Sequence, residues 1–153
     1  MAITPEHPKG QLLFCIDSDQ EEHHTAEMED AVRQLASARA WTISPPEFVD
    51  VTEEPDDPDS DDLPIRTVGG LVELYRIDGE WFERTPVDVV RSQLHDVKAI
   101  VEAMSAFSAR TGLDIAFELN DDSVGWIKRG SPNRLLREGM LDEWERALAA
   151  RNA

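Results

Sequence analysis

An acidic run in the first half of the chain most constrains what this sequence can fold into. Seven of the ten residues from 53 to 62 are Asp or Glu, and two more are Pro. Like charges repel one another, and proline fits neither a helix interior nor the ladder of a central strand. We therefore expect an extended, solvated and mobile loop over residues 53–63. Its acidic side chains are Glu53, Glu54, Asp56, Asp57, Asp59, Asp61 and Asp62.

The negative charge of the chain is concentrated in the same region. The net charge is −17 over 153 residues, and residues 1–63 alone carry 17 acidic and 3 basic side chains, a net of −14. Such a chain repels phosphate backbones and anionic lipid surfaces. No apolar run reaches the ~20 residues that cross a bilayer. We therefore expect neither direct nucleic-acid binding nor membrane binding.

The length of the chain suits one domain with a real hydrophobic core. Neither side of the acidic run has a convincing core of its own, so we expect a flexible N-terminus at residues 1–10 and a single domain over residues 11–150. No secretory signal is visible. The single cysteine, Cys15, cannot form an internal disulfide, which fits the cytoplasm, and its apolar neighbours indicate a small buried side chain rather than a nucleophile.

Hydrophobic patterning predicts a fold that alternates strands with helices. The Asp78-Gly79 pair favours a hairpin between residues 71–77 and 81–84. A second hairpin is expected with Leu119 opposite Val124 and Phe117 opposite Trp126. Because hairpins dominate, we expect an α+β fold with a mixed or mainly antiparallel sheet and about three helices packed on it. The other strands are expected at 11–16 and 47–52, and the helices at 20–40, 85–110 and 140–150.

One enzymatic interpretation comes from the end of the first strand. A buried apolar strand that ends in Asp17-x-Asp19 resembles the first motif of the haloacid-dehalogenase-like phosphatases. The resemblance implies that one aspartate attacks phosphorus while the second acts as acid and base. In that case Asp121-Asp122 would imitate the family's magnesium-binding pair, and Lys98 its lysine. The alternative is that Asp17 and Asp19 cap the helix that follows.

Two further patterns contain side chains that can bind metals. His23 and Glu27 are four residues apart on a helix, with His24 beside them, which is a spacing that can clasp a transition metal. In the acidic run, alternate aspartates recur as in a calcium loop, but Asp62 and Val68 stand where that loop needs Gly and Glu. The commoner explanation for both is a solvated polar surface, so we expect no metal and no cofactor.

The interpretation that remains is binding through charge. Acidic loops pair with basic surfaces, and this complementarity speeds association and selects partners. Affinity also needs apolar anchors, for which Trp41, Trp81 and Trp126 are candidates if they are exposed. We expect a non-enzymatic protein that binds a basic protein partner through the acidic run. By class and composition, it is similar to bacterial immunity-type inhibitors of basic toxins.

Overall fold

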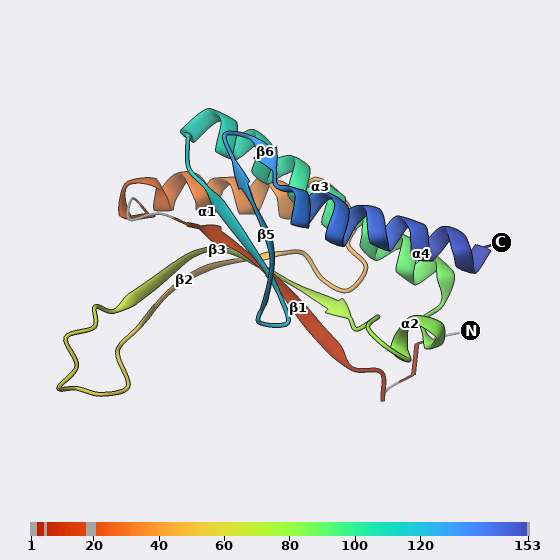
Figure 1. The fold of residues 1–153 in the computed structure, drawn as a ribbon. Coiled ribbons are helices and arrows are strands. Elements are labelled where there is room, and N and C mark those ends of the chain that lie inside the picture. Colours follow the sequence, from red (N-terminus) through yellow and green to blue (C-terminus); the bar gives the residue numbers. More distant parts are fainter. Residues whose placement is uncertain (1–2, 5, 18–20, 153) are drawn as a thin grey trace.

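The computed structural model describes residues 3–4, 6–17 and 21–152 (Figure 1). Strands and helices are mixed along the chain, and the last helix is preceded by a wider, π-helical stretch, η1. The elements are β1 (Lys9–Ile16), α1 (Glu21–Ser37), β2 (Glu47–Glu53), β3 (Ile65–Tyr75), α2 (Trp81–Arg84), α3 (Val87–Thr111), β4 (Ile115–Leu119), β5 (Asp122–Lys128), β6 (Ser131–Pro132), η1 (Leu135–Asp142) and α4 (Glu143–Asn152).

The strands form one six-stranded sheet in the order β2-β3-β1-β4-β5-β6, and every neighbouring pair is antiparallel. The β1-α1-β2 connection passes over β3, and the β3-α3-β4 connection passes over β1. These are two interlocked split β-α-β units, the ferredoxin-like connectivity, extended here by β5, β6 and the C-terminal helix. The expected α+β fold with a mainly antiparallel sheet is therefore confirmed.

The hydrophobic core lies between one face of the sheet and the helices. Figure 1 shows α1 and α3 over this face, with α4 running beside α3. Leu12 and Phe14 of β1 have no exposed surface, and neither do Val97, Ile100 and Met104 of α3. Burial of each such side chain is worth about 1.5–3 kcal/mol. The helix expected at 85–110 thus presents these residues to the core, and it is capped by Gly112, whose φ of 77° is left-handed.

The other face of the sheet is free of helices in the part of the chain that the structure describes. Leu13, Cys15 and Leu71 lie half-buried on it. Val51, Ile65 and Trp126 are more exposed, with 49%, 67% and 40% of their surface accessible. We call this surface the open face. Antiparallel sheets commonly leave one face to solvent, and on this one several large apolar side chains are exposed.

The expected hairpin between residues 71–77 and 81–84 is wrong. Trp81–Arg84 forms the short helix α2 instead. β1 pairs with one edge of β3 as far as Tyr75, whereas β2 pairs with the other edge only as far as Leu71. At the end of β3, the buried amide of Gln93 takes the place of a strand partner. It accepts the N–H of Tyr75 at 2.6 Å and donates to the C=O of the same residue at 3.1 Å.

The expected register of the second hairpin is also wrong. Asn120 and Asp121 form the turn, with φ angles of 51° and 71°, so Leu119 lies opposite Asp122. Asn and Asp accept this left-handed conformation more readily than most residues. A bulge then shifts the register within β5, and Trp126 lies opposite Ala116 instead of Phe117. Because a one-residue shift exchanges the faces of a strand, Trp126 lies on the open face.

The structure predicts that Gly70→Ala destabilises the protein by about 1–3 kcal/mol, because overpacking a core displaces its side chains. An added Cβ would lie 2.2 Å from Cζ of Phe14, which is fully buried. Urea unfolding measures the loss. Gly139→Ala is the matched control, since its Cβ would meet only the tip of Leu135 at 3.1 Å. Equal losses in the two variants would contradict the packing described here.

Candidate functional site

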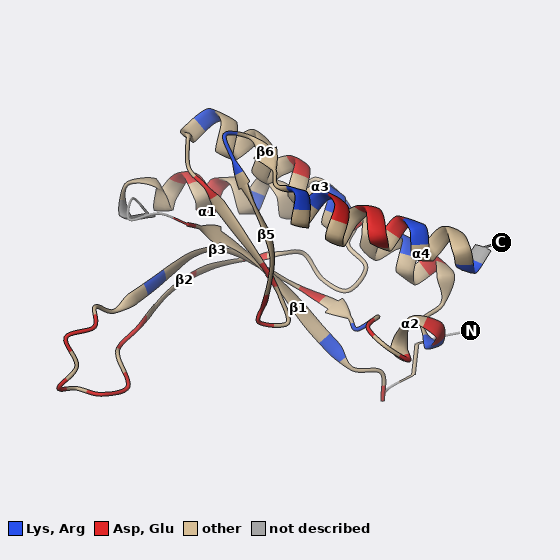
Figure 2. Ribbon diagram, viewed as in Figure 1, with Lys and Arg blue, Asp and Glu red and all other residues tan. Residues whose placement is uncertain are grey.

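The acidic residues occupy the tip of the β2–β3 hairpin. The two strands pair from Glu47 opposite Leu71 to Glu53 opposite Ile65, and the chain between them leaves the sheet. Figure 1 shows this segment projecting away from the helices. We call residues 53–62 the acidic tip. In Figure 2, acidic residues follow one another around it, whereas α3 and α4 carry both signs of charge.

The acidic tip is shaped by short local hydrogen bonds. The backbone N–H of Asp59 donates to the carboxylate of Asp57 at 3.0 Å, and that of Asp62 donates to the hydroxyl of Ser60 at 3.1 Å. Its acidic side chains are exposed, and no ion pair among the described residues includes any of them. The charges therefore remain available to groups outside the chain.

Apolar side chains lie directly beside the acidic tip. Leu63, at the return of the loop, is 83% accessible, and Ile65, two residues further on, is also exposed. Both line an open hollow of about 570 Å³ together with Glu53, Asp56 and other tip residues. Val51 lies on the same side, because it faces Thr67, two residues along β3 from Ile65. Charge and apolar surface thus meet at one end of the molecule, as in the core and rim of a protein interface.

An ion pair holds the base of the hairpin. The guanidinium of Arg66 donates through Nε and Nη2 to the two carboxylate oxygens of Asp50, both at 2.9 Å. This hydrogen-bonded pair lowers the pKa of Asp50, because a guanidinium favours the charged carboxylate. Arg66 also donates to the hydroxyl of Thr25 on α1 at 3.4 Å. The base of the hairpin is therefore connected to the helical layer.

Asp96 positions the connection into β2, and its role could not be expected from its place in the sequence. It lies on α3 with 1% of its surface accessible. One carboxylate oxygen is 2.9 Å from Nη2 of Arg39, and the other accepts the N–H of Thr42 at 3.1 Å. Arg39 also donates to the C=O of His95. A buried carboxylate is costly unless it is paired, so the ion pair with Arg39 and the hydrogen bond from Thr42 hold residues 39–42 in place.

The residues of the phosphatase interpretation are not assembled into one site. Asp17 is exposed, and its N–H donates to the C=O of Asp114 just before β4. Asp121 and Asp122 follow the opposite end of β4. Lys98 forms an ion pair with Glu145 of α4. Asp19, the remaining candidate, lies outside the described residues.

No metal-binding cluster is present among the described residues, in which no group of three His, Cys, Asp or Glu side chains could hold an ion. His23 is exposed, and the imidazole that approaches Glu27 belongs to His24, at 3.3 Å. In the acidic tip, the exposed carboxylates likewise form no cage.

The thiol of Cys15 lies half-buried on the open face. Burial, together with the nearby carboxylates of Glu118 and Asp17, raises its pKa to about 11. A thiol with this pKa is almost entirely protonated near neutral pH and is a poor nucleophile. The sequence-based interpretation of Cys15 as a small buried side chain is met only in part, because the residue is half-buried.

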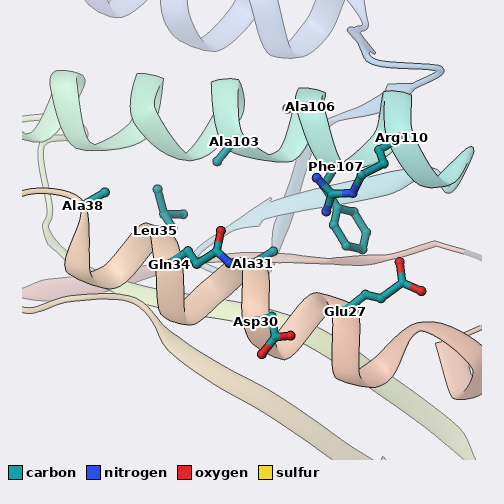
Figure 3. A pocket seen from close by; sticks show the side chains of 10 residues that line it. All are labelled: Glu27, Asp30, Ala31, Gln34, Leu35, Ala38, Ala103, Ala106, Phe107 and Arg110. Atoms are coloured by element: carbon teal, nitrogen blue, oxygen red, sulfur yellow. The ribbon is translucent and has the colours of Figure 1, made fainter.

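A shallow groove of about 490 Å³ lies between α1 and α3 (Figure 3). Small side chains form much of its lining, among them Ala31 and Ala103, and Arg110 lies over the ring of Phe107 at 5.5 Å. Acidic and basic groups both border it, so its charge selects no particular partner. Another recess, of about 380 Å³ and mostly apolar, includes Trp144 and lies toward the end of the sheet away from the acidic tip.

Comparisons with known proteins identify no relative of this chain. No protein-family model, curated protein or solved structure matches it. None of the helices in the described ranges combines the length and the apolar content that a bilayer span requires. The function must therefore be inferred from the site, in which the acidic tip and the neighbouring apolar side chains are the most distinctive features.

We predict that Asp96→Asn destabilises the protein by about 1–3 kcal/mol, because a charged partner of Arg39 is lost while the bond from Thr42 can remain. Thermal or urea unfolding measures the change. The control is Glu102→Gln, an exposed position on the same helix, for which a change within about 0.5 kcal/mol is expected. A loss no larger than that of the control would show that Asp96 does not hold the connection.

Alkylation of Cys15 by iodoacetamide is expected to accelerate about tenfold per pH unit from pH 8 to pH 10, since only the thiolate reacts. This range lies below the folded-state pKa of about 11, so the thiolate fraction keeps rising throughout it. Mass spectrometry follows the reaction, with protein unfolded in guanidinium as the faster-reacting control at pH 8. A rate that levels off by pH 9 would contradict the raised pKa.

Proposed function

We propose that this protein is a non-enzymatic binding protein that docks on a basic protein partner through the acidic tip. The observation that carries the proposal is the projection of seven exposed acidic side chains that no ion pair of the described residues neutralises. Elsewhere in the molecule, several acidic side chains are paired with Arg or Lys, as Glu138 is with Arg134 and Glu145 with Lys98. Complementary charge of this kind accelerates encounter and restricts the choice of partner.

The apolar side chains beside the tip supply the second part of an interface. Charge alone steers two proteins together, whereas affinity comes mostly from desolvated apolar anchors. Leu63 and Ile65 lie directly beside the acidic tip. Val51 and Trp126 are exposed on the open face of the sheet. The most concrete form of the proposal is an immunity-type inhibitor of a basic toxin. Its compartment would be the cytoplasm, which suits a chain with one cysteine.

The test compares two variants that change the net charge equally. The tip variant carries Asn at four tip positions, and the control variant carries the corresponding amides at four exposed acids elsewhere, so both change the formal charge from −17 to −13. The tip changes are Asp56→Asn, Asp59→Asn, Asp61→Asn and Asp62→Asn. The control changes are Glu83→Gln, Glu102→Gln, Asp122→Asn and Asp142→Asn.

The wild-type protein is used to capture partners from the native host, and the captured protein is identified and purified. Association with the three forms is then measured by stopped flow at low and high salt. The tip variant should associate about tenfold or more slowly at low salt, and the control much less so, because steering depends on local charge. Equal rates for the two variants, or a captured partner that is not basic, would refute the proposal.

A further inference from the structure

Strand β2 leaves one edge of the sheet open. It is the first strand in the order β2-β3-β1-β4-β5-β6 and pairs only with β3. Beyond that ladder, no backbone hydrogen bond to residues 47–53 occurs among the described residues. An unpaired strand edge presents a row of N–H and C=O groups that can accept another strand. We call the side of β2 that faces away from β3 the free edge.

The two ends of the sheet are protected very differently. The opposite end is β6, which has only two residues, one of them Pro132, and both features obstruct pairing. In contrast, β2 has seven residues from Glu47 to Glu53, with no proline and no register shift against β3. Five or six residues are typical of a complete strand. The free edge is therefore long and regular enough to pair with one.

The charges on β2 disfavour a second copy of this chain as its occupant. If two β2 strands paired antiparallel around Asp50, that residue would face its own copy, and Glu47 would face Glu53. Like charges directly opposite each other destabilise a strand pair. The acidic tips would add repulsion of the same sign. The same charges favour a strand that carries Lys or Arg, which identifies the class of occupant.

The open face specifies the pattern of this occupant in more detail. Four alternate residues of β2 share the open face, because each lies opposite a residue of β3 on that face. They are Glu47, Val49, Val51 and Glu53, opposite Leu71, Gly69, Thr67 and Ile65 respectively. A strand added at the free edge would place its own alternate residues beside these four. Apolar residues suit the two valines, and basic residues suit the two glutamates.

We propose that the free edge of β2 accepts an extended basic segment of a partner protein by β-strand addition, with apolar residues flanked by Lys or Arg. This inference rests on the proposed function and adds the mode of binding. The acidic tip attracts the basic partner, and the backbone of β2 then holds one of its segments in register. Main-chain hydrogen bonds contribute affinity, and the alternate side chains contribute specificity.

The test uses synthetic peptides as probes of the intact protein. The basic peptide has the order Lys, Thr, Val, Thr, Val, Thr, Lys, and the acidic peptide has Glu in place of both lysines. A third peptide keeps the lysines and valines but has proline at each threonine, so it cannot form a continuous ladder. Binding is followed by NMR chemical shifts and by hydrogen exchange of the backbone amides.

The basic peptide should shift and protect the amides of residues 47–53, and the proline peptide should not. The Glu47→Lys/Glu53→Lys variant should reverse the preference by about tenfold, from the basic to the acidic peptide, because the cross-strand charges are then inverted. The Asp59→Lys/Asp61→Lys control makes the same change in net charge at the acidic tip, and it should still prefer the basic peptide.

Three outcomes would overturn strand addition: equal reversal in the two Lys variants, equal binding of the proline peptide, or amide shifts absent from β2. Failure of this inference is distinguishable from failure of the proposed function. The association rates of the tip variant with the captured partner test the role of the acidic tip, whether or not the peptides bind at β2.

Discussion

The fold depends on the central strand β1, which is hydrogen-bonded along both edges and buried on one face. β3 and β4 pair with it on either side, and Leu12 and Phe14 lie beneath the helices without exposed surface. Because β1 already has two neighbours, the other strands must join further out. This constraint places β2 at one end of the sheet. The acidic tip and the free edge therefore lie at the same end.

Polar contacts extend this arrangement from the core to the acidic hairpin. The buried carboxylate of Asp96 anchors the chain just before β2, and Arg66 joins Asp50 on β2 and also reaches α1. These bonds give the hairpin a fixed base, while the charges of the tip remain unpaired by the described residues. A well-ordered base and unneutralised charge at the tip suit docking on a basic protein, since less ordering is then required on binding.

Local patterns predicted much of the fold but little of the pairing between distant segments. The helix expected at 85–110 corresponds to α3, because helix periodicity and helix ends are local properties. The Asp78-Gly79 turn misled, since the edge of β3 that its hairpin would have needed is bonded at Tyr75 by the side chain of Gln93, a residue distant in sequence. The predicted register at Trp126 was also wrong, because a bulge depends on the partner strand and leaves no clear sequence signal.

The sequence by itself determined that most of the acidic run forms an exposed loop, because adjacent carboxylates and prolines disfavour burial and regular pairing, although Glu53 still pairs within β2. It also determined the class of the fold through the alternation of apolar patterns. Only the tertiary structure decided that the loop joins an edge strand and that Leu63 and Ile65 are exposed beside it. It also decided that Asp96, far along the chain, holds the connection into that strand. Strand order and long-range contacts arise from the mutual burial of segments distant in sequence, and no local pattern encodes them.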